Sequence, residues 1–181
     1  MQESDHMKRV YVNEKWCLGC HLCEYNCAFA NSGMTDMVKA LKDKPIFPRI
    51  HIEGDEKISF AVSCRHCTDP ICVKSCIAGA LSAQDGVIRI DRSKCVSCLT
   101  CILVCPFGAL AQGADGVMQK CELCVSNACG EPACVTGCPN KAIVYEERGS
   151  GWPNMSLSET ELPQQAVLKA SAAWIRNLRS Q

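Results

Sequence analysis

The chain has 181 residues, of which 17 are cysteines, 21% are charged and only 6% are aromatic. Its 19 basic and 19 acidic residues balance, so no excess of positive charge favours nucleic-acid binding. No apolar run approaches the roughly 20 residues that a membrane-spanning helix needs. The length suits one compact domain or two small ones, and the cysteine density is typical of disulfide scaffolds and metalloproteins.

The first 16 residues contain no apolar segment and no paired arginines, so they carry no readable export signal. We therefore expect a cytoplasmic protein, in which clustered cysteines bind metal rather than each other. A short strand-like run then leads into the first of four cysteine groups, which consists of Cys17, Cys20, Cys23 and Cys27.

An insertion separates the first group from the second. Residues 36–42 predict one or two helical turns, which Pro45 and Pro48 end. Residues 49–62 alternate apolar and polar side chains around Gly54-Asp55, a pattern that predicts a β-hairpin. We expect this hairpin to cover a metal site, although contact with a partner protein is the open alternative.

The other three groups follow this insertion. The second group is Cys64, Cys67, Cys72 and Cys76, and the third is Cys95, Cys98, Cys101 and Cys105. The fourth has five cysteines, namely Cys121, Cys124, Cys129, Cys134 and Cys138. After the last cysteine of groups two, three and four we expect a helical turn, a Gly or Asn that breaks it, and a short strand, as at 87–90 and 142–145.

The groups repeat, which indicates internal duplication. A shift of 78 residues, from Cys17 to Cys95, superimposes all four cysteines of group one on group three. Group two aligns with group four when the Pro70–Val73 segment is matched to Pro132–Val135. This alignment pairs Cys72 with Cys134 and leaves Cys129 over, either as a free thiol or as a substitute ligand.

The spacing favours [4Fe–4S] clusters over three alternatives. Cys-x2-Cys-x2-Cys can bring three thiolates around one cubane, and Cys95 to Pro106 matches the bacterial ferredoxin run without a substitution. Zinc needs no third cysteine at that spacing, and disulfides need an oxidising compartment. The sequence CLGCH also fits c-type haem attachment, but that reading leaves Cys23 and Cys27 unexplained. We expect His21 to be an ordinary loop residue.

The C-terminal segment differs in kind. Residues 149–154 form a Gly/Ser/Pro-rich linker, and Val167, Ala170, Trp174 and Leu178 then fall on one face at helical spacing. We expect an amphipathic helix there. It packs either on its own domain or on another chain, such as a catalytic subunit or a neighbouring copy.

Residues 9–147 resemble the four-cluster ferredoxin-like subunits of anaerobic oxidoreductases. These include the iron–sulfur subunits of carbon monoxide dehydrogenase, formate dehydrogenase, hydrogenase-linked, dimethyl-sulfoxide-reductase-type and tungsten aldehyde oxidoreductase complexes. The most specific matches are CRHCTDPICVKSC, CVSCLTCILVCPFGAL and KCELC with PACVTGCP. Ala28 and Ile77 stand where proline often follows the fourth cysteine, but neither change removes a ligand.

The resemblance implies an α+β, duplicated bacterial-type ferredoxin fold around four nested clusters. One unit with two clusters comprises residues 7–63 and 106–147, an inserted unit with two clusters comprises 64–105, and 148–181 follows as linker and helix. Four ligand sets are implied, which we call A to D. Set A is Cys17, Cys20, Cys23 and Cys138, and set B is Cys27, Cys121, Cys124 and Cys134. Set C is Cys64, Cys67, Cys72 and Cys105, and set D is Cys76, Cys95, Cys98 and Cys101. Spacing alone also permits group one to pair with two, and three with four.

The resemblance implies an electron-transfer subunit without a catalytic residue of its own. No dinucleotide, P-loop or nucleophile-elbow motif is present in the sequence. The expected partners are a large tungsten, molybdenum or nickel–iron subunit, a flavin or NAD-reducing subunit or ferredoxin, and neighbouring copies. A free polyferredoxin carrier is the alternative.

Four oxidised cubanes with their thiolates would add roughly −8 to the neutral chain. Five basic residues beside the cysteine loops are candidates to offset this charge or are ordinary surface: Lys15, Arg65, Lys74, Lys94 and Lys120.

Overall fold

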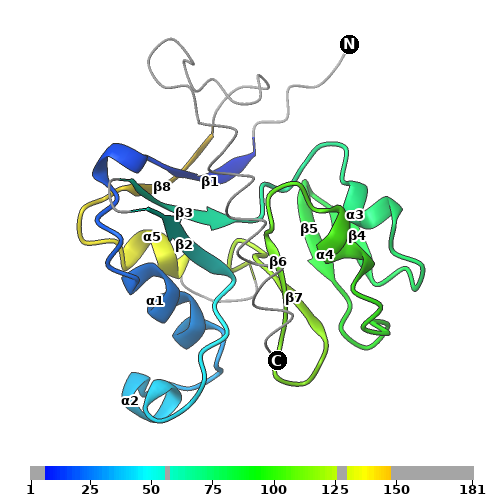
Figure 1. Ribbon diagram of the computed structural model, residues 1–181, viewed down its shortest axis with the longest axis horizontal. Helices are drawn as coiled ribbons and strands as arrows, with labels where there is room; N and C mark the ends of the chain where they lie inside the picture. The colour runs from blue at the N-terminus through cyan, green and yellow to red at the C-terminus, as the bar shows by residue number, and fades with distance from the viewer. Residues whose placement is uncertain (1–6, 56–57, 126–129, 148–181) are drawn as a thin grey trace.

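The computed structural model describes residues 7–55, 58–125 and 130–147, which form many short elements and no long one (Figure 1). The strands are β1 (Lys8–Val12), β2 (Ile50–Gly54), β3 (Ser59–Ser63), β4 (Leu81–Gln84), β5 (Val87–Ile90), β6 (Leu110–Gln112), β7 (Met118–Lys120) and β8 (Ile143–Glu147). The helices are the 3-10 turn η1 (Glu14–Trp16), α1 (Leu22–Ala30), α2 (Met37–Leu41), α3 (Ile71–Lys74), α4 (Thr100–Val104) and α5 (Ala133–Thr136).

The strands pair as four antiparallel two-stranded sheets. Three are hairpins between neighbours in the chain, β2 with β3, β4 with β5 and β6 with β7. The fourth joins β1 to β8, with Val10 opposite Tyr145. This pairing brings residues from both ends of the described chain into one sheet, so groups one and four lie at the same end of the molecule.

Figure 1 shows the result as two parts. One part holds the β1–β8 and β2–β3 sheets with α1, α2 and α5, while the other holds α3, α4 and the β4–β5 hairpin. The β6–β7 hairpin runs between them. The chain therefore enters the first part, crosses to the second for groups two and three, and returns for group four.

The hydrophobic core is divided in the same way, and cysteines belong to both halves. One cluster of buried residues includes Val10, Ile50 and Ile143 together with five cysteines. The other surrounds Ile88 and Leu110 and includes Cys101. Since small apolar side chains and thiols supply so much of the interior, ligands bound to those thiols would complete it.

Several predicted elements are confirmed. Helix α2 begins after Asp36, whose carboxylate accepts hydrogen bonds from the N–H groups of Val38 and Lys39. The hairpin around Gly54 is present as β2 and β3, and the predicted strand at 87–90 is β5. Asp85 and Gly86 both have positive φ, as a two-residue hairpin turn requires.

One prediction is wrong in its placement. The short helices α3, α4 and α5 contain the third ligand cysteine of their groups and end before the fourth, so they do not start at the fourth. A tight turn follows instead, in which the N–H three residues on donates to the carbonyl of Cys76, Cys105 or Cys138. The left-handed residue of this turn is Gly79, Gly108 or Lys141, so Asn140 does not take that role.

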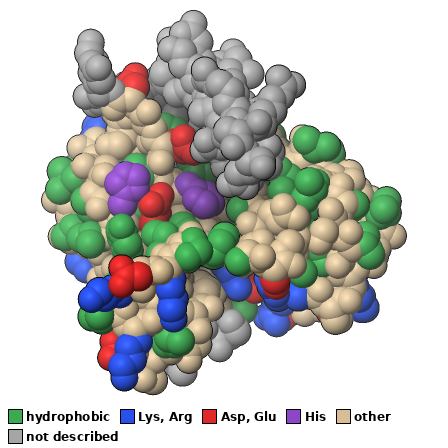
Figure 2. Space-filling model, turned by 60° about the horizontal axis from the view of Figure 1, so that its bottom comes forward, with side chains coloured by type: hydrophobic (Ala, Val, Ile, Leu, Met, Phe, Trp, Pro, Cys, Tyr) green, Lys and Arg blue, Asp and Glu red, His purple; other side chains and the backbone are tan. Residues whose placement is uncertain are grey.

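Two further predictions, the C-terminal helix and its linker at 148–181 and the fate of Cys129, lie outside the described residues. Within the described ranges, no helix is long and apolar enough to cross a membrane. The visible face in Figure 2 mixes positive and negative side chains without a broad field of either sign.

Candidate metal centres

The cysteine loops are shaped by left-handed backbone residues at matching positions. In group one these are Gly19 and His21, and at the equivalent positions of group three they are Ser97 and Leu99. A non-glycine residue with positive φ is uncommon and costs energy, so its recurrence at functional loops needs a reason. Here the reversed twist curls each loop, which lets successive cysteines face a common centre.

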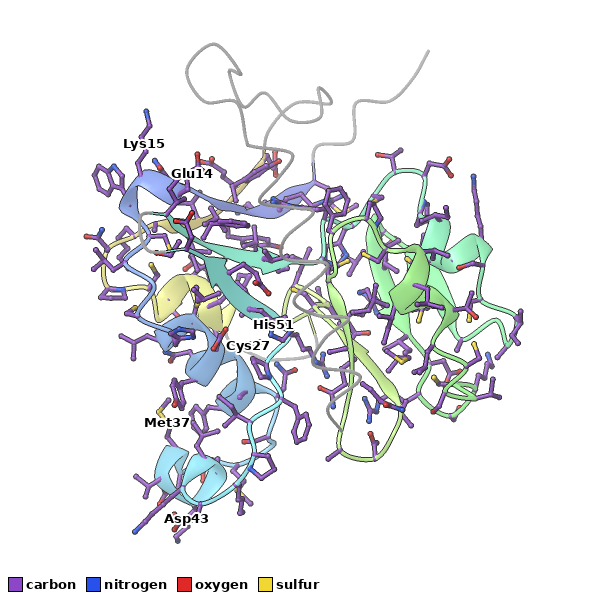
Figure 3. All side chains as sticks on the ribbon, in the orientation of Figure 1. Glu14, Lys15, Cys27, Met37, Asp43 and His51 are labelled. Carbon is purple, nitrogen blue, oxygen red and sulfur yellow. The ribbon has the colours of Figure 1, made fainter. Side chains whose placement is uncertain are left out.

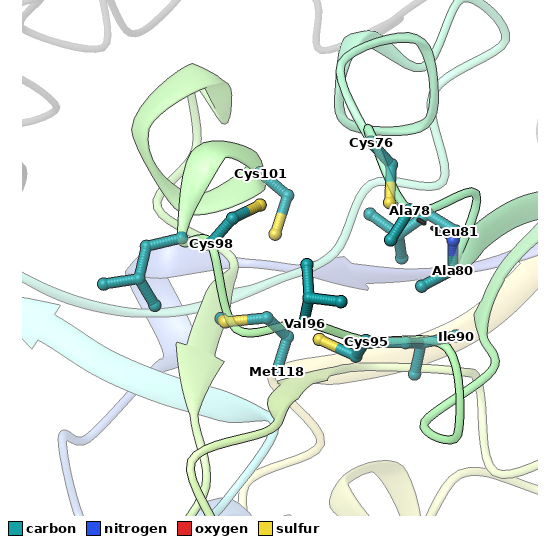
Figure 4. Close-up of a pocket in the computed structure, with 11 residues that line it drawn as sticks. Cys76, Ala78, Ala80, Leu81, Ile90, Cys95, Val96, Cys98, Cys101 and Met118 are labelled. Carbon is teal, nitrogen blue, oxygen red and sulfur yellow. Dashed lines mark hydrogen bonds between the residues drawn. The ribbon is translucent and has the colours of Figure 1, made fainter.

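Two such centres are visible as cavities. Set D lines one of them, with Ile90 and Met118 beside the thiols (Figure 4). Set A lines the other, where Ile52 and Ile143 close the wall. In both cases three cysteines come from one loop and the fourth comes from another group far along the chain.

The remaining eight cysteines are buried or half-buried, and their electrostatic influence on each other indicates which are close. The pKa of Cys121 is raised to about 12, mainly by burial, and Cys27 and Cys64 contribute to the rise. The pKa of Cys134 is also raised, first by burial and then by Cys121 and Cys27. The thiols of Cys27, Cys121 and Cys134 in set B therefore lie near one another, and Cys64 of set C lies near Cys121.

Set C shows the same pattern around Cys105. Burial is the main cause of the raised pKa values of Cys64, Cys67 and Cys72, and Cys105 adds to all three. A thiol with a raised pKa is a poor ligand unless a bound cation stabilises its thiolate form, as iron does.

Amide hydrogen bonds to sulfur are already in place at several of these cysteines. The sulfur of Cys27, on α1 (Figure 3), accepts from the backbone N–H of Arg49 at 3.2 Å. Cys76 accepts from Ala80 at 3.3 Å, and Cys121 from Leu123 at 3.4 Å. Such bonds stabilise thiolates and are one of the means by which proteins tune iron–sulfur potentials.

His66 provides a separate test of whether an inorganic cluster fits. Its ring is 2% exposed, and burial, Lys120 and Arg9 lower its pKa to about 3. Because Nδ1 accepts from the N–H of Ile88 at 3.0 Å, the proton of the neutral ring lies on Nε2. Among the described residues Nε2 has no hydrogen-bond partner. His66 lies in the loop between Cys64 and Cys67, where a cluster sulfide would supply the acceptor that its Nε2 lacks.

In the described part of the chain, no three His, Cys, Asp or Glu side chains converge closely enough to hold a single metal ion. A cubane separates its thiolates more widely than a single ion does, because each sulfur binds a different iron. The donor sets here, thiols alone in fours, are those that [4Fe–4S] clusters use.

The basic residues near the cysteine loops differ sharply in solvent exposure. Lys15, Lys74 and Lys94 are exposed, and Lys15 points away from the body in Figure 3. Lys120, in contrast, is among the most buried side chains, with 1% exposure. Sequence reasoning grouped these residues together, and it missed His66, Arg49 and Glu122 altogether.

The comparisons with known proteins agree with this chemistry. The model of the 4Fe-4S dicluster domain family matches residues 56–148. The chain belongs to this family. It is a ferredoxin-like protein of the [4Fe–4S] type, whose role is electron transfer.

Three relatives place this membership in context. An iron-sulfur protein of Rhodospirillum rubrum is 39% identical over 74% of this chain and 79% of its own. The electron transport protein HydN of Escherichia coli K12 is 31% identical over 77% of this chain and 87% of its own. The beta subunit of an NADH-dependent phenylglyoxylate dehydrogenase of Aromatoleum evansii is 37% identical, and the match spans 77% of this chain but 31% of that subunit.

Proposed function

We propose that this chain is an electron-transfer subunit that carries four [4Fe–4S] clusters and relays electrons through them in a line. The observation that supports the proposal is that sets A and D each line a cavity, while the thiols of sets B and C act on one another electrostatically. In this proposal sixteen thiolates serve as iron ligands. Each iron is then fully coordinated by its cluster, which leaves no open position for a substrate and no catalytic residue.

The nested ligand sets are part of the proposal. The alternative pairing of group one with two is disfavoured because Cys138, from group four, lines the same cavity as Cys17, Cys20 and Cys23. Likewise Cys76, from group two, lines the cavity of group three. The proposal also retains the duplicated fold, with units 7–63 plus 106–147 and 64–105, supported by the matching left-handed residues of groups one and three.

The proposed order A–B–C–D is supported by thiols of different sets that act on one another. Cys23 of set A raises the pKa of Cys134 of set B, and Cys64 of set C does so for Cys121 of set B. Helix α3 carries Cys72 of set C and leads directly to Cys76 of set D. Electrons would then enter at one outer cluster, pass two inner ones and leave at the other.

The outer clusters are the exchange points in this scheme. Cys20 of set A and Cys98 of set D are exposed, while Cys27, Cys121 and Cys134 of set B are buried. We infer that one end faces a large catalytic oxidoreductase subunit of the tungsten, molybdenum or nickel–iron type. The other end would face a flavin or NAD-reducing subunit, a ferredoxin or a second copy. The dehydrogenase beta subunit among the relatives supports an oxidoreductase partner.

A free electron carrier is the second candidate. It is favoured by HydN, a relative named simply as an electron transport protein, of which the match covers 87%. Anaerobic affinity purification from the native host separates the two functions. Recovery with a large subunit that contains tungsten, molybdenum or nickel supports the complex, whereas a pure monomer supports the carrier.

The ligand sets are tested by comparing single cysteine substitutions in anaerobically prepared protein. Cys20→Ser and Cys138→Ser should change the same cluster signal in electron paramagnetic resonance (EPR) spectra, because both belong to set A. Cys98→Ser should change a different one. If Cys138→Ser instead alters the signal that responds to Cys98→Ser, the nested assignment is wrong.

A further inference from the structure

Lys120 stands out because its ammonium group is buried and has no carboxylate partner among the described residues. Its side chain is 1% exposed. The ammonium group donates to the carbonyl of Ile88 and, at 2.5 Å, to that of Cys121. Within the described residues no carboxylate lies in ion-pair contact with it. Hydrogen bonds to two carbonyl groups offset only part of the desolvation penalty of a buried ammonium group.

The surroundings indicate where the missing negative charge belongs. The Lys120 ammonium group donates to the carbonyl of Cys121 in set B. Ile88, whose carbonyl is its other acceptor, donates its own N–H to His66, which lies between Cys64 and Cys67 of set C. The Lys120 ammonium group is therefore held close to both inner sets. Two strands fix its position, because Lys120 ends β7 while Ile88, whose carbonyl oxygen accepts its hydrogen bond, belongs to β5.

We propose that Lys120 is the internal counter-cation of the two inner clusters and raises their reduction potentials relative to the outer pair. This inference rests on the proposed four-cluster function. Each inner cluster gains a negative charge when it is reduced, and a fixed cation nearby stabilises that reduced state. In the low dielectric of the interior the effect is larger than at the surface and is little screened by salt. Lys120 is a positioning residue for charge and is not a cluster ligand.

The chain supplies a matched control in Lys94. Both lysines immediately precede the first cysteine of a group, Cys95 and Cys121 respectively. The Lys94 side chain is 61% exposed and forms an ion pair with Asp91 at 3.2 Å. Water and Asp91 screen its charge, so its removal should leave the potential of the set D cluster almost unchanged.

The test is an EPR-monitored redox titration of the full chain purified without oxygen, after its iron and acid-labile sulfide have been measured. Lys120→Met should shift the reduction equilibrium of two clusters at least tenfold toward the oxidised state, which is 59 mV per one-electron couple. The other two clusters, and all four in Lys94→Met, should keep their midpoints. Unchanged midpoints in Lys120→Met, or equal shifts in all four, would overturn the inference.

Further variants cover the case in which Lys120→Met fails to assemble. Lys120→Gln removes the charge but keeps N–H donors for the two carbonyls, and Lys120→Arg keeps the charge. Cluster loss in both neutral variants but not in Lys120→Arg supports the counter-cation. Cluster loss in all three shows instead that the site needs the shape of lysine. The iron content of the unmodified protein tests the four-cluster function separately.

Discussion

At the scale of single residues, ionisable side chains near the cysteines also connect the two parts of the molecule through hydrogen bonds. Glu122 lies between Cys121 and Cys124 in the sequence, and both of its carboxylate oxygens have hydrogen-bond partners elsewhere in the chain. One oxygen accepts from Arg49 at 3.1 Å and the other from the N–H of Ile90 at 2.9 Å. It thereby connects the segment before β2 with β5, which belong to the two different parts of the molecule.

Replacing Glu122 with glutamine should weaken this connection. Gln keeps one acceptor oxygen, so either Arg49 or the Ile90 amide loses its partner, and both side chains of the ion pair are only 18% exposed. We expect a loss of about 1–3 kcal/mol of stability in the cluster-loaded protein. Differential scanning calorimetry under argon would show this as a midpoint lower by several degrees.

Asp115→Asn is the control for Glu122→Gln, since it removes the carboxylate of an exposed ion pair with Arg92. An exposed pair contributes little, so its midpoint should match that of the unmodified protein. Equal midpoints for all three proteins would mean that Glu122 does not hold the two parts together.

Single residues also show which features of the site can be predicted from the sequence. The Cys-x2-Cys-x2-Cys spacing predicts cluster loops because the three ligands are local to one segment. Lys94 and Lys120 have the same local context, yet one is exposed and the other buried. Only the packing of β5 against β7 distinguishes them, and no local pattern encodes that contact. His66 was overlooked for the same reason, since its partner is the distant amide of Ile88.

At the scale of elements, the pairing of β1 with β8 is the feature on which set A depends. Val12 and Ile143 are opposite each other in this sheet, and the Ile143 side chain is 2% exposed. It also lines the cavity of set A. The sheet therefore brings the loop of group one to Cys138, which is 121 residues from Cys17 along the chain.

Ile143→Ala should cost about 2–5 kcal/mol, the range for truncation of a fully buried aliphatic side chain. We expect the set A cluster to be lost first on mild warming or chelation, while the set D cluster persists, because set D belongs to the other part of the core. Time-resolved EPR spectra of the anaerobic protein would follow the two clusters separately.

Ile77→Ala is the matched truncation at the other end, beside Cys76, where the side chain is 79% exposed. It should leave both clusters unaffected, because it removes no buried contact. If Ile77→Ala and Ile143→Ala released iron at the same rate, the β1–β8 sheet would not be what protects set A.

These elements illustrate which parts of the fold can be predicted from the sequence. Gly54-Asp55 predicts the turn of the β2–β3 hairpin, and residues 36–42 predict α2, because these signals act on their own neighbours. The placement of α3, α4 and α5 was wrong by about one turn. The helix in each group contains the third ligand cysteine, namely Cys72, Cys101 or Cys134, instead of starting at the fourth.

At the scale of the whole molecule, the interior contains few large apolar side chains and many thiols. Cys23, Cys101, Cys121 and Cys134 are all buried and have raised pKa values. A chain of this composition is best explained if inorganic clusters occupy the centre and the short sheets form a shell around them. The family match, which describes two clusters over residues 56–148, accounts for part of this centre. Group one lies outside the matched residues, and in the proposed function it combines with group four to bring the number of clusters to four.

The most direct test of the account is the iron and acid-labile sulfide content of anaerobically purified protein, measured per chain and checked by Mössbauer spectroscopy. Four cubanes predict about 16 iron atoms and about 16 sulfides, all in the [4Fe–4S] form. A reproducible value near eight of each, or zinc in place of iron, would contradict the four-cluster chain.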